Sequence, residues 1–195
     1  MKTFVKNAFA GLCFVALFLL VSASAQAQVL AHSGDVAGYA GYLHLSNTDL
    51  PSSNHGIYGA SGGYNITPNI TVLGEWNLVP LYSGGGETIR TQLFGGGARF
   101  NMMPDKKIVP YGVFNVGYDR LTFSGGGSET VSGYYFGVGG GASCYLGKNW
   151  GVRPEFRYVR PEYSSGGESQ SFNSIAMTGG VFYQWGGTGT AKKKK

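Results

Sequence analysis

The sequence is poor in charged residues and nearly free of cysteine. Charged side chains make up 13% of its 195 residues, against about 25% in typical soluble domains. Of its two cysteines, Cys13 lies in an N-terminal apolar run, which leaves only Cys144 in the rest of the chain. An internal disulfide is therefore excluded, even for an exported protein.

Long apolar runs and helical periodicity are also missing after residue 28. No stretch there resembles a hydrophobic spanning helix, and none keeps a 3.6-residue apolar period. The 34 glycines would destabilise the interior of any helix. The remaining possibility is a single β domain of ordinary size.

The N-terminus predicts a secretory signal peptide. A basic start precedes an apolar run over 8–21, and small residues follow it up to Ala27. This run is shorter than the roughly 20 residues that a spanning helix needs. We expect cleavage after Ala27 and export of the rest.

The basic charge is confined to the two ends of the chain. The net charge is +5, but without Lys2, Lys6 and the final four lysines 9 basic residues face 10 acidic ones. No basic face for nucleic acid is implied, so we expect no nucleic-acid partner.

The sequence from Asp35 onward alternates in character with the period of two that is typical of strands. We expect eight strands, over 35–45, 56–66, 70–79, 88–102, 108–122, 130–146, 151–160 and 172–185.

The two faces of these strands differ in character. In the seventh run, Pro154 and Phe156 alternate with Arg153, Glu155 and Arg157. Aromatic residues gather on the apolar faces near strand ends, as in the girdles of a lipid-embedded barrel. Lipid tolerates β-structure only when the sheet closes on itself. The pattern therefore predicts an all-β fold, an eight-stranded antiparallel up-and-down transmembrane β-barrel.

Seven aromatic residues are expected to form the girdles: Tyr39, Trp76, Phe100, Tyr118, Tyr134, Tyr183 and Trp185. A soluble ligand-binding barrel is the alternative, but it would expose a large apolar patch that includes Trp76 and Phe114. The domain organisation that follows is a signal peptide (1–27), an outer-membrane barrel (28–185) and a short lysine-ending tail (186–195).

Five charged residues on the polar faces are predicted to share one layer of the interior: Glu75, Arg99, Arg153, Glu155 and Arg157. An eight-stranded barrel is just wide enough to be filled by its side chains, and buried charges must be paired. We expect an ion network that fills the lumen. A narrow polar path for ions or small solutes is the alternative.

Three glycine-rich phrases follow one another at a regular interval. "YSGGGET", "FSGGGSET" and "YSSGGES" begin 41 and 40 residues apart, which corresponds to two strands and one short turn. Each phrase is thus expected at the tip of an external loop. Glu87, Glu129 and Glu168 lie in these tips and are candidates for contact with a cation or a host surface.

The phrases "RPEFRY", "GGGARFN" and "VPYGVFNVGY", together with the alternation of short and long connections, resemble the small outer-membrane β-barrel family. That family includes the transmembrane domain of outer membrane protein A and outer membrane protein X. The last strand ends in Trp185, where the family more often has phenylalanine. The resemblance implies a monomer in the bacterial outer membrane, with a structural or surface-interaction role through four external loops.

The same resemblance implies the partners of the chain: outer-membrane lipid, lipopolysaccharide, the barrel-insertion machinery and a surface ligand of the loops. Some barrels of this kind modify lipid A with a histidine and a serine at the external level. His44, His55, Ser52 and Ser53 lie there, but no motif places an acidic partner beside them. We expect no enzyme activity, no cofactor and no metal.

Overall fold

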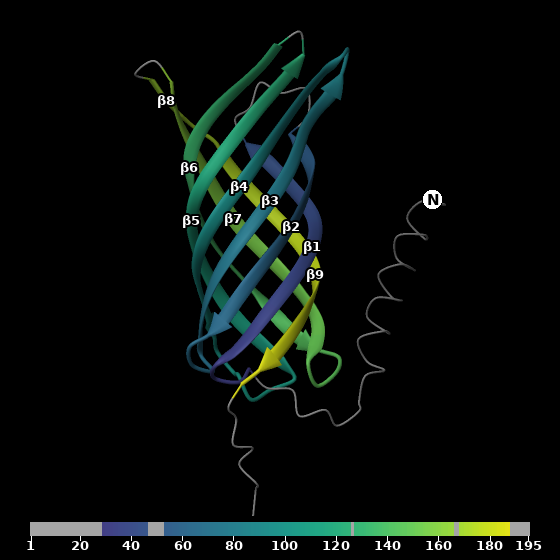
Figure 1. Ribbon diagram of the computed structural model, residues 1–195, viewed down its shortest axis with the longest axis vertical. Helices are drawn as coiled ribbons and strands as arrows, with labels where there is room; N and C mark the ends of the chain where they lie inside the picture. Colours follow the sequence, from purple (N-terminus) through teal and green to yellow (C-terminus); the bar gives the residue numbers. More distant parts are fainter. Residues whose placement is uncertain (1–28, 47–52, 126, 166–167, 188–195) are drawn as a thin grey trace, which may run out of the picture.

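The computed structural model describes residues 29–46, 53–125, 127–165 and 168–187, which form a closed barrel (Figure 1). Its described strands are β1 (Ser33–Ser46), β2 (Asn54–Asn65), β3 (Ile70–Gly84), β4 (Glu87–Asn101), β5 (Ile108–Gly125), β6 (Gly127–Tyr145), β7 (Trp150–Ser165), β8 (Glu168–Ser171) and β9 (Asn173–Gly186). The predicted signal peptide and most of the tail lie outside the described residues and stay predictions.

Antiparallel pairing joins consecutive strands from β1 to β8, and β9 closes the barrel by pairing with β7 and β1. The short β8 pairs only with β7, and β9 continues along β7 after an interruption at Phe172. The Phe172 amide still donates a hydrogen bond to the Pro161 carbonyl, at 3.2 Å. β8 and β9 therefore act as one interrupted strand, and the predicted eight-stranded antiparallel barrel is confirmed.

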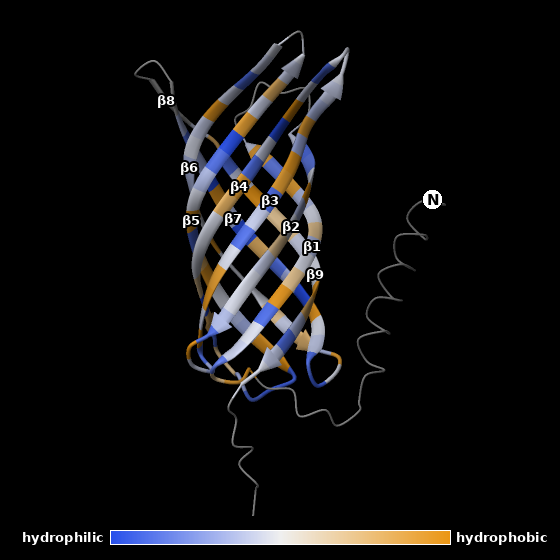
Figure 2. Cartoon of the chain, viewed as in Figure 1, coloured by the Kyte–Doolittle hydropathy of each residue, from blue (hydrophilic) through white to orange (hydrophobic). Residues whose placement is uncertain are grey.

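Strict alternation assigns the two faces of the sheet. Thr71 and Asn115 point inward and are fully buried, whereas Val72, Phe114 and Val116 point outward and are about half exposed. Figure 2 shows apolar and polar residues alternating along the strands. The apolar face is thus the outer one. None of the described residues belongs to a helix long and apolar enough to cross a membrane.

The two ends of the barrel differ in their connections. Short turns over 66–69, 102–107 and 146–149 mark one end, here called the turn end. At the other, the hairpin end, β3–β4 and β5–β6 extend as long hairpins (Figure 1). Gly85 and Gly86, with φ of 63° and 83°, form a two-residue connection of the kind that matches strand twist.

The strands of these hairpins extend further than predicted, into segments that were expected to be external loops. Glu87 begins β4, Glu129 lies within β6 and Glu168 begins β8, so all three belong to strands rather than to loop tips. The glycine phrase at Tyr82 supplies a tight turn, and pairing therefore continues almost to the tip. Glu87 and Glu129 are exposed at the hairpin end.

Glycine is required where inward-facing residues meet a neighbouring strand. A Cβ on Gly97 would overlap the carbonyl oxygen of Phe114 and lie 2.7 Å from the Asn115 Cα. Gly62, on the outer face of β2, has nothing within 4 Å of its Cβ position.

We expect Gly97→Ala to lower the free energy of unfolding by about 1–3 kcal/mol, because it overpacks backbone that cannot move aside. Gly62→Ala is the matched control and should fold as the wild type does. The measurement is the fraction with heat-dependent gel mobility after refolding at increasing urea. Equal midpoints for the two variants would contradict the prediction.

Candidate functional site

Two clusters of charged residues occupy the lumen. The first, near the turn end, is the turn-end cluster of Asp35, Arg99 and Arg153. The Asp35 carboxylate accepts hydrogen bonds from Arg153 at 3.0 Å and from Arg99 at 3.3 Å. The Arg153 guanidinium also lies 4.5 Å from the centre of the Phe182 ring. All three charged side chains are buried.

The second group is the central cluster of Glu75, Glu155 and Arg157. Nη1 of Arg157 lies 2.7 Å from both carboxylate oxygens of Glu75, and its Nη2 donates to Glu155. Glu75 also accepts hydrogen bonds from Asn115 and from the Tyr135 hydroxyl. Arg157 is therefore the cation that holds the two glutamates together.

Tyr111 connects the two clusters. Its hydroxyl donates to Glu155 at 2.9 Å, and the Arg99 guanidinium lies 5.2 Å from the centre of its ring. The structure thus places the five predicted charged residues in the lumen, but in two clusters rather than in one layer.

Sequence reasoning missed Asp35, which pairs with two arginines. The signal was present in the charge count, because the predicted set of three arginines and two glutamates leaves one positive charge without a partner. Asp35 is the first residue of the first predicted strand, and alternation along that strand places its side chain on the inner face.

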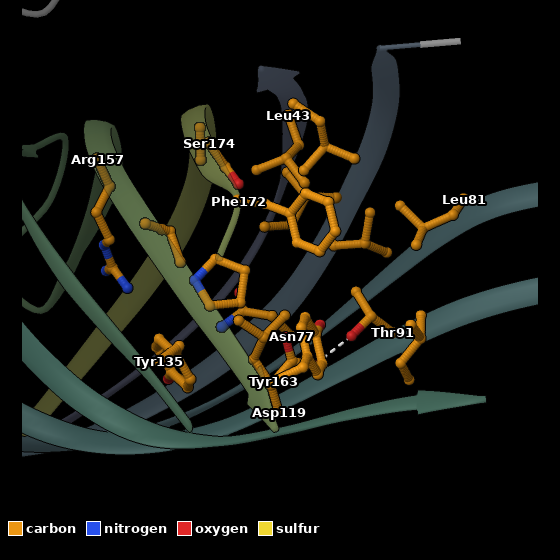
Figure 3. A pocket seen from close by; sticks show the side chains of 18 of the residues that line it. Leu43, Asn77, Leu81, Thr91, Asp119, Tyr135, Arg157, Tyr163, Phe172 and Ser174 are labelled. Atoms are coloured by element: carbon orange, nitrogen blue, oxygen red, sulfur yellow. Dashed lines mark hydrogen bonds between the residues drawn. The ribbon is translucent and has the colours of Figure 1, made fainter. Parts of the chain in front are cut away.

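The hairpin half of the lumen is not filled, which corrects the predicted plug. A cavity of about 780 Å³, here called the outer cavity, lies above the central cluster (Figure 3). Its apolar wall includes Leu43, Ile57, Val79, Leu93, Val159 and Ala176. These side chains belong to one cluster of buried apolar residues, whereas longer arginine and tyrosine side chains occupy the lumen nearer the turn end.

The floor of the outer cavity is polar. Glu75, Glu155 and Arg157 of the central cluster reach it, and Asp119 on β5 is a further charged residue of the cavity lining. Asp119 accepts hydrogen bonds from the hydroxyls of Thr91 and Tyr163 (Figure 3).

Tyr39 is on the wrong face for a girdle. Its side chain points into the lumen, where its hydroxyl donates to Asn77 at 2.9 Å. The prediction rested on its aromatic character. Tyr39 lies an even number of residues after Asp35 on the same strand, so both side chains point into the lumen. The other six predicted girdle residues point outward and are exposed: Trp76, Phe100, Tyr118, Tyr134, Tyr183 and Trp185. Their position at a membrane surface stays a prediction.

The structure does not bring the candidate enzyme residues together. His44 points outward and contacts Asn54 at 2.8 Å, whereas His55 is buried on the inner face. Ser53 is half-buried, and Ser52 lies outside the described residues. No group of three metal-ligating side chains occurs in the described part of the chain.

We expect Asp35→Ala to cost about 3–5 kcal/mol of the free energy of unfolding, because two arginines lose their only carboxylate partner in the turn-end cluster. Asp105→Ala is the control, since Asp105 forms an exposed ion pair with Lys106 and should matter little. Urea unfolding from lipid vesicles measures both. A loss for Asp35→Ala no larger than that for Asp105→Ala would refute the buried-charge argument.

The geometry matches known outer-membrane barrels. Residues 13–184 match the family model described as outer membrane protein beta-barrel domain. A comparison with curated protein sequences finds no match.

Among solved structures, the barrel is similar to Neisserial surface protein A, with 18% identity, a TM-score of 0.65 and coverage of 77% of this chain and 96% of that one. Ail, the attachment invasion locus protein of Yersinia pestis, has 16% identity, a TM-score of 0.56 and coverage of 80% and 100%. The N-terminal barrel domain of Pseudomonas aeruginosa OprF has 12% identity, a TM-score of 0.56 and coverage of 80% and 99%. At these identities the structures show a shared fold. The family match covers most of the chain, which therefore belongs to the outer membrane protein β-barrel domain family and is a bacterial outer-membrane protein.

Proposed function

We propose that this barrel binds a small apolar molecule from the cell exterior and that it acts as a monomeric, non-enzymatic binding protein rather than as a pore. The observation that supports this proposal is the outer cavity, which lies above a lumen closed by paired charges. With the turn end in the periplasm, as the family resemblance implies, the cavity faces outward.

The periplasmic half of the lumen leaves little room for a solute. A void of about 20 Å³ lies between the two clusters, lined by side chains that include Arg99, Arg153 and Arg157. That is space for about one water molecule. A permanent route through the lumen would have to break the ion pairs of both clusters.

The outer cavity, by contrast, has the size and lining of a ligand site. Its volume falls within the roughly 300–1,000 Å³ of small-molecule pockets, which are mostly apolar with a few polar groups. Leu43, Ile57 and Val79 are buried deep in its wall, whereas Leu81 and Phe123 near the hairpin end are half-buried. Exposure thus rises toward the external end, which supports entry from outside.

We expect hexanol to bind the wild-type barrel in nanodiscs and to bind Ala176→Phe at least about tenfold more weakly. Ala176 is a buried wall residue, so a phenyl ring there occupies ligand space. Ala60→Phe is the matched control, because Ala60 is exposed on the outer face of β2. Calorimetry against empty nanodiscs measures both. Binding that Ala176→Phe leaves unchanged would place the site outside the cavity.

Conductance in planar bilayers distinguishes a closed barrel from a channel. We expect no conductance steps from the wild type or from Arg157→Ala, because Asp35, Arg99 and Arg153 still close the lumen nearer the turn end when the central cluster is broken. Glu162→Gln, at an exposed position on β7, is the control and should stay silent. Frequent steps from folded wild-type protein would favour a channel.

A second candidate function is contact at the cell surface through the long hairpins. The β3–β4 and β5–β6 hairpins extend at the hairpin end (Figure 1). Arg90, Arg120 and Arg160 are exposed on the outer face toward this end. Guanidinium groups there suit the phosphates of lipopolysaccharide. Ail has been crystallised in complex with the heparin analogue sucrose octasulfate, an anionic ligand on a barrel of this fold.

A further inference from the structure

The lining of the outer cavity carries more negative than positive charge. Glu75, Glu155 and Asp119 line it, and Arg157 is the only cation that lines it among the described residues. Arg99 and Arg153 do not line this cavity and both pair with Asp35 nearer the turn end. Three carboxylates therefore face the cavity with one guanidinium among them.

Asp119 is the clearest source of this excess negative charge. Asp119 is 1% exposed, and the side chains that donate hydrogen bonds to it are the hydroxyls of Thr91 and Tyr163. Neutral hydroxyls orient a carboxylate but do not balance its charge. A cation that enters the cavity would supply the opposite charge that this buried carboxylate otherwise lacks.

Aromatic rings border the same space. Tyr39, Phe123, Tyr135, Tyr163 and Phe172 line the cavity, and Figure 3 shows Tyr135, Tyr163 and Phe172 around it. The hydroxyls of Tyr135 and Tyr163 donate to Glu75 and Asp119, so both rings are held beside carboxylates. The faces of aromatic rings attract cations, and more strongly where water is excluded.

The cavity wall also holds a polar group without a partner. Ser174 is 2% exposed, lines the cavity, and its hydroxyl oxygen has no hydrogen-bond partner among the described residues. Buried polar atoms are nearly always satisfied, and an orphan calls for an explanation. A ligand with an N–H donor would satisfy the Ser174 oxygen, whereas a plain hydrocarbon would not.

We propose that the outer cavity selects small organic cations, namely protonated amines with an alkyl or aryl body. The apolar wall takes the body, and the ammonium group lies at the Asp119 carboxylate, beside the ring of Tyr163. This inference rests on the proposed function of the cavity and adds the chemical class of its ligand. An anionic amphiphile of equal size would meet the excess carboxylates and be rejected.

The test compares three probes that share a hexyl chain: hexylammonium, hexanol and heptanoate, whose carboxylate replaces the ammonium. Each is titrated at neutral pH into the full barrel in nanodiscs of zwitterionic lipid, with empty nanodiscs as reference. We expect hexylammonium to bind at least about tenfold more tightly than hexanol, and heptanoate to bind most weakly.

Variants locate the selectivity. Asp119→Asn keeps the shape of the side chain and should remove most of the preference for hexylammonium over hexanol, measured as the ratio of the two dissociation constants in each variant. If Asp119→Asn does not fold by the gel-mobility check, Glu155→Gln tests independently whether carboxylates of the cavity lining cause the preference for hexylammonium. Glu162→Gln removes an equal charge from the outer face and should leave the preference intact.

Each outcome decides one question. Equal binding of hexylammonium and hexanol, or tighter binding of heptanoate, overturns the cation proposal while the binding cavity stands. A preference that Glu162→Gln lowers as much as Asp119→Asn shows a general surface-charge effect and also overturns it. No binding of any probe above that of empty nanodiscs overturns the proposed function itself.

Discussion

Hydrogen bonding between β1 and β9 is the constraint on which the rest of this structure depends. It runs from Ser33 opposite Gly186 to Ser46 opposite Asn173 and leaves the barrel without a free edge along this seam. In a bilayer no water can hydrogen-bond to unpaired backbone N–H and C=O groups, so the sheet must close on itself. Closure also encloses a lumen, and every inward side chain must then find its partners inside it.

The enclosed lumen explains why the charged residues form clusters. A buried ion pair is weak evidence for stability, because the cost of desolvation offsets much of the attraction. An unpaired buried charge costs far more. Arg99 and Arg153 share Asp35, and Glu75 and Glu155 share Arg157, so each cluster satisfies its charges around one shared ion. The inward glycines make this possible, because the strands beside them leave space for long side chains: Arg157 carbons lie close to the Cβ positions of Gly137 and Gly139.

Much of the fold could be predicted from the sequence, because alternation with period two reports which face a residue occupies. That signal is local, and it identified the strands, the lipid-facing surface and the inward position of residues such as Glu75 and Arg153. Tyr39 was misplaced because its chemistry was weighed above its parity with Asp35. The hairpin extensions were missed because glycine and serine have low strand propensity, whereas the Gly85–Gly86 turn lets pairing continue. The outer cavity could not be predicted, since its volume depends on how far side chains from every strand reach across the barrel.

The uneven distribution of charge along the barrel gives the lumen a direction. The turn-end cluster has two arginines for one carboxylate, and the lining of the outer cavity has three carboxylates for one arginine. Tyr111 lies between them, with its ring toward Arg99 and its hydroxyl on Glu155. A cation that reaches the cavity floor therefore meets attraction from the carboxylates there and repulsion from the two arginines beyond. The same arrangement that would favour a cation in the outer cavity would oppose its passage toward the turn end, so one distribution of charge supports the proposal of binding without transport.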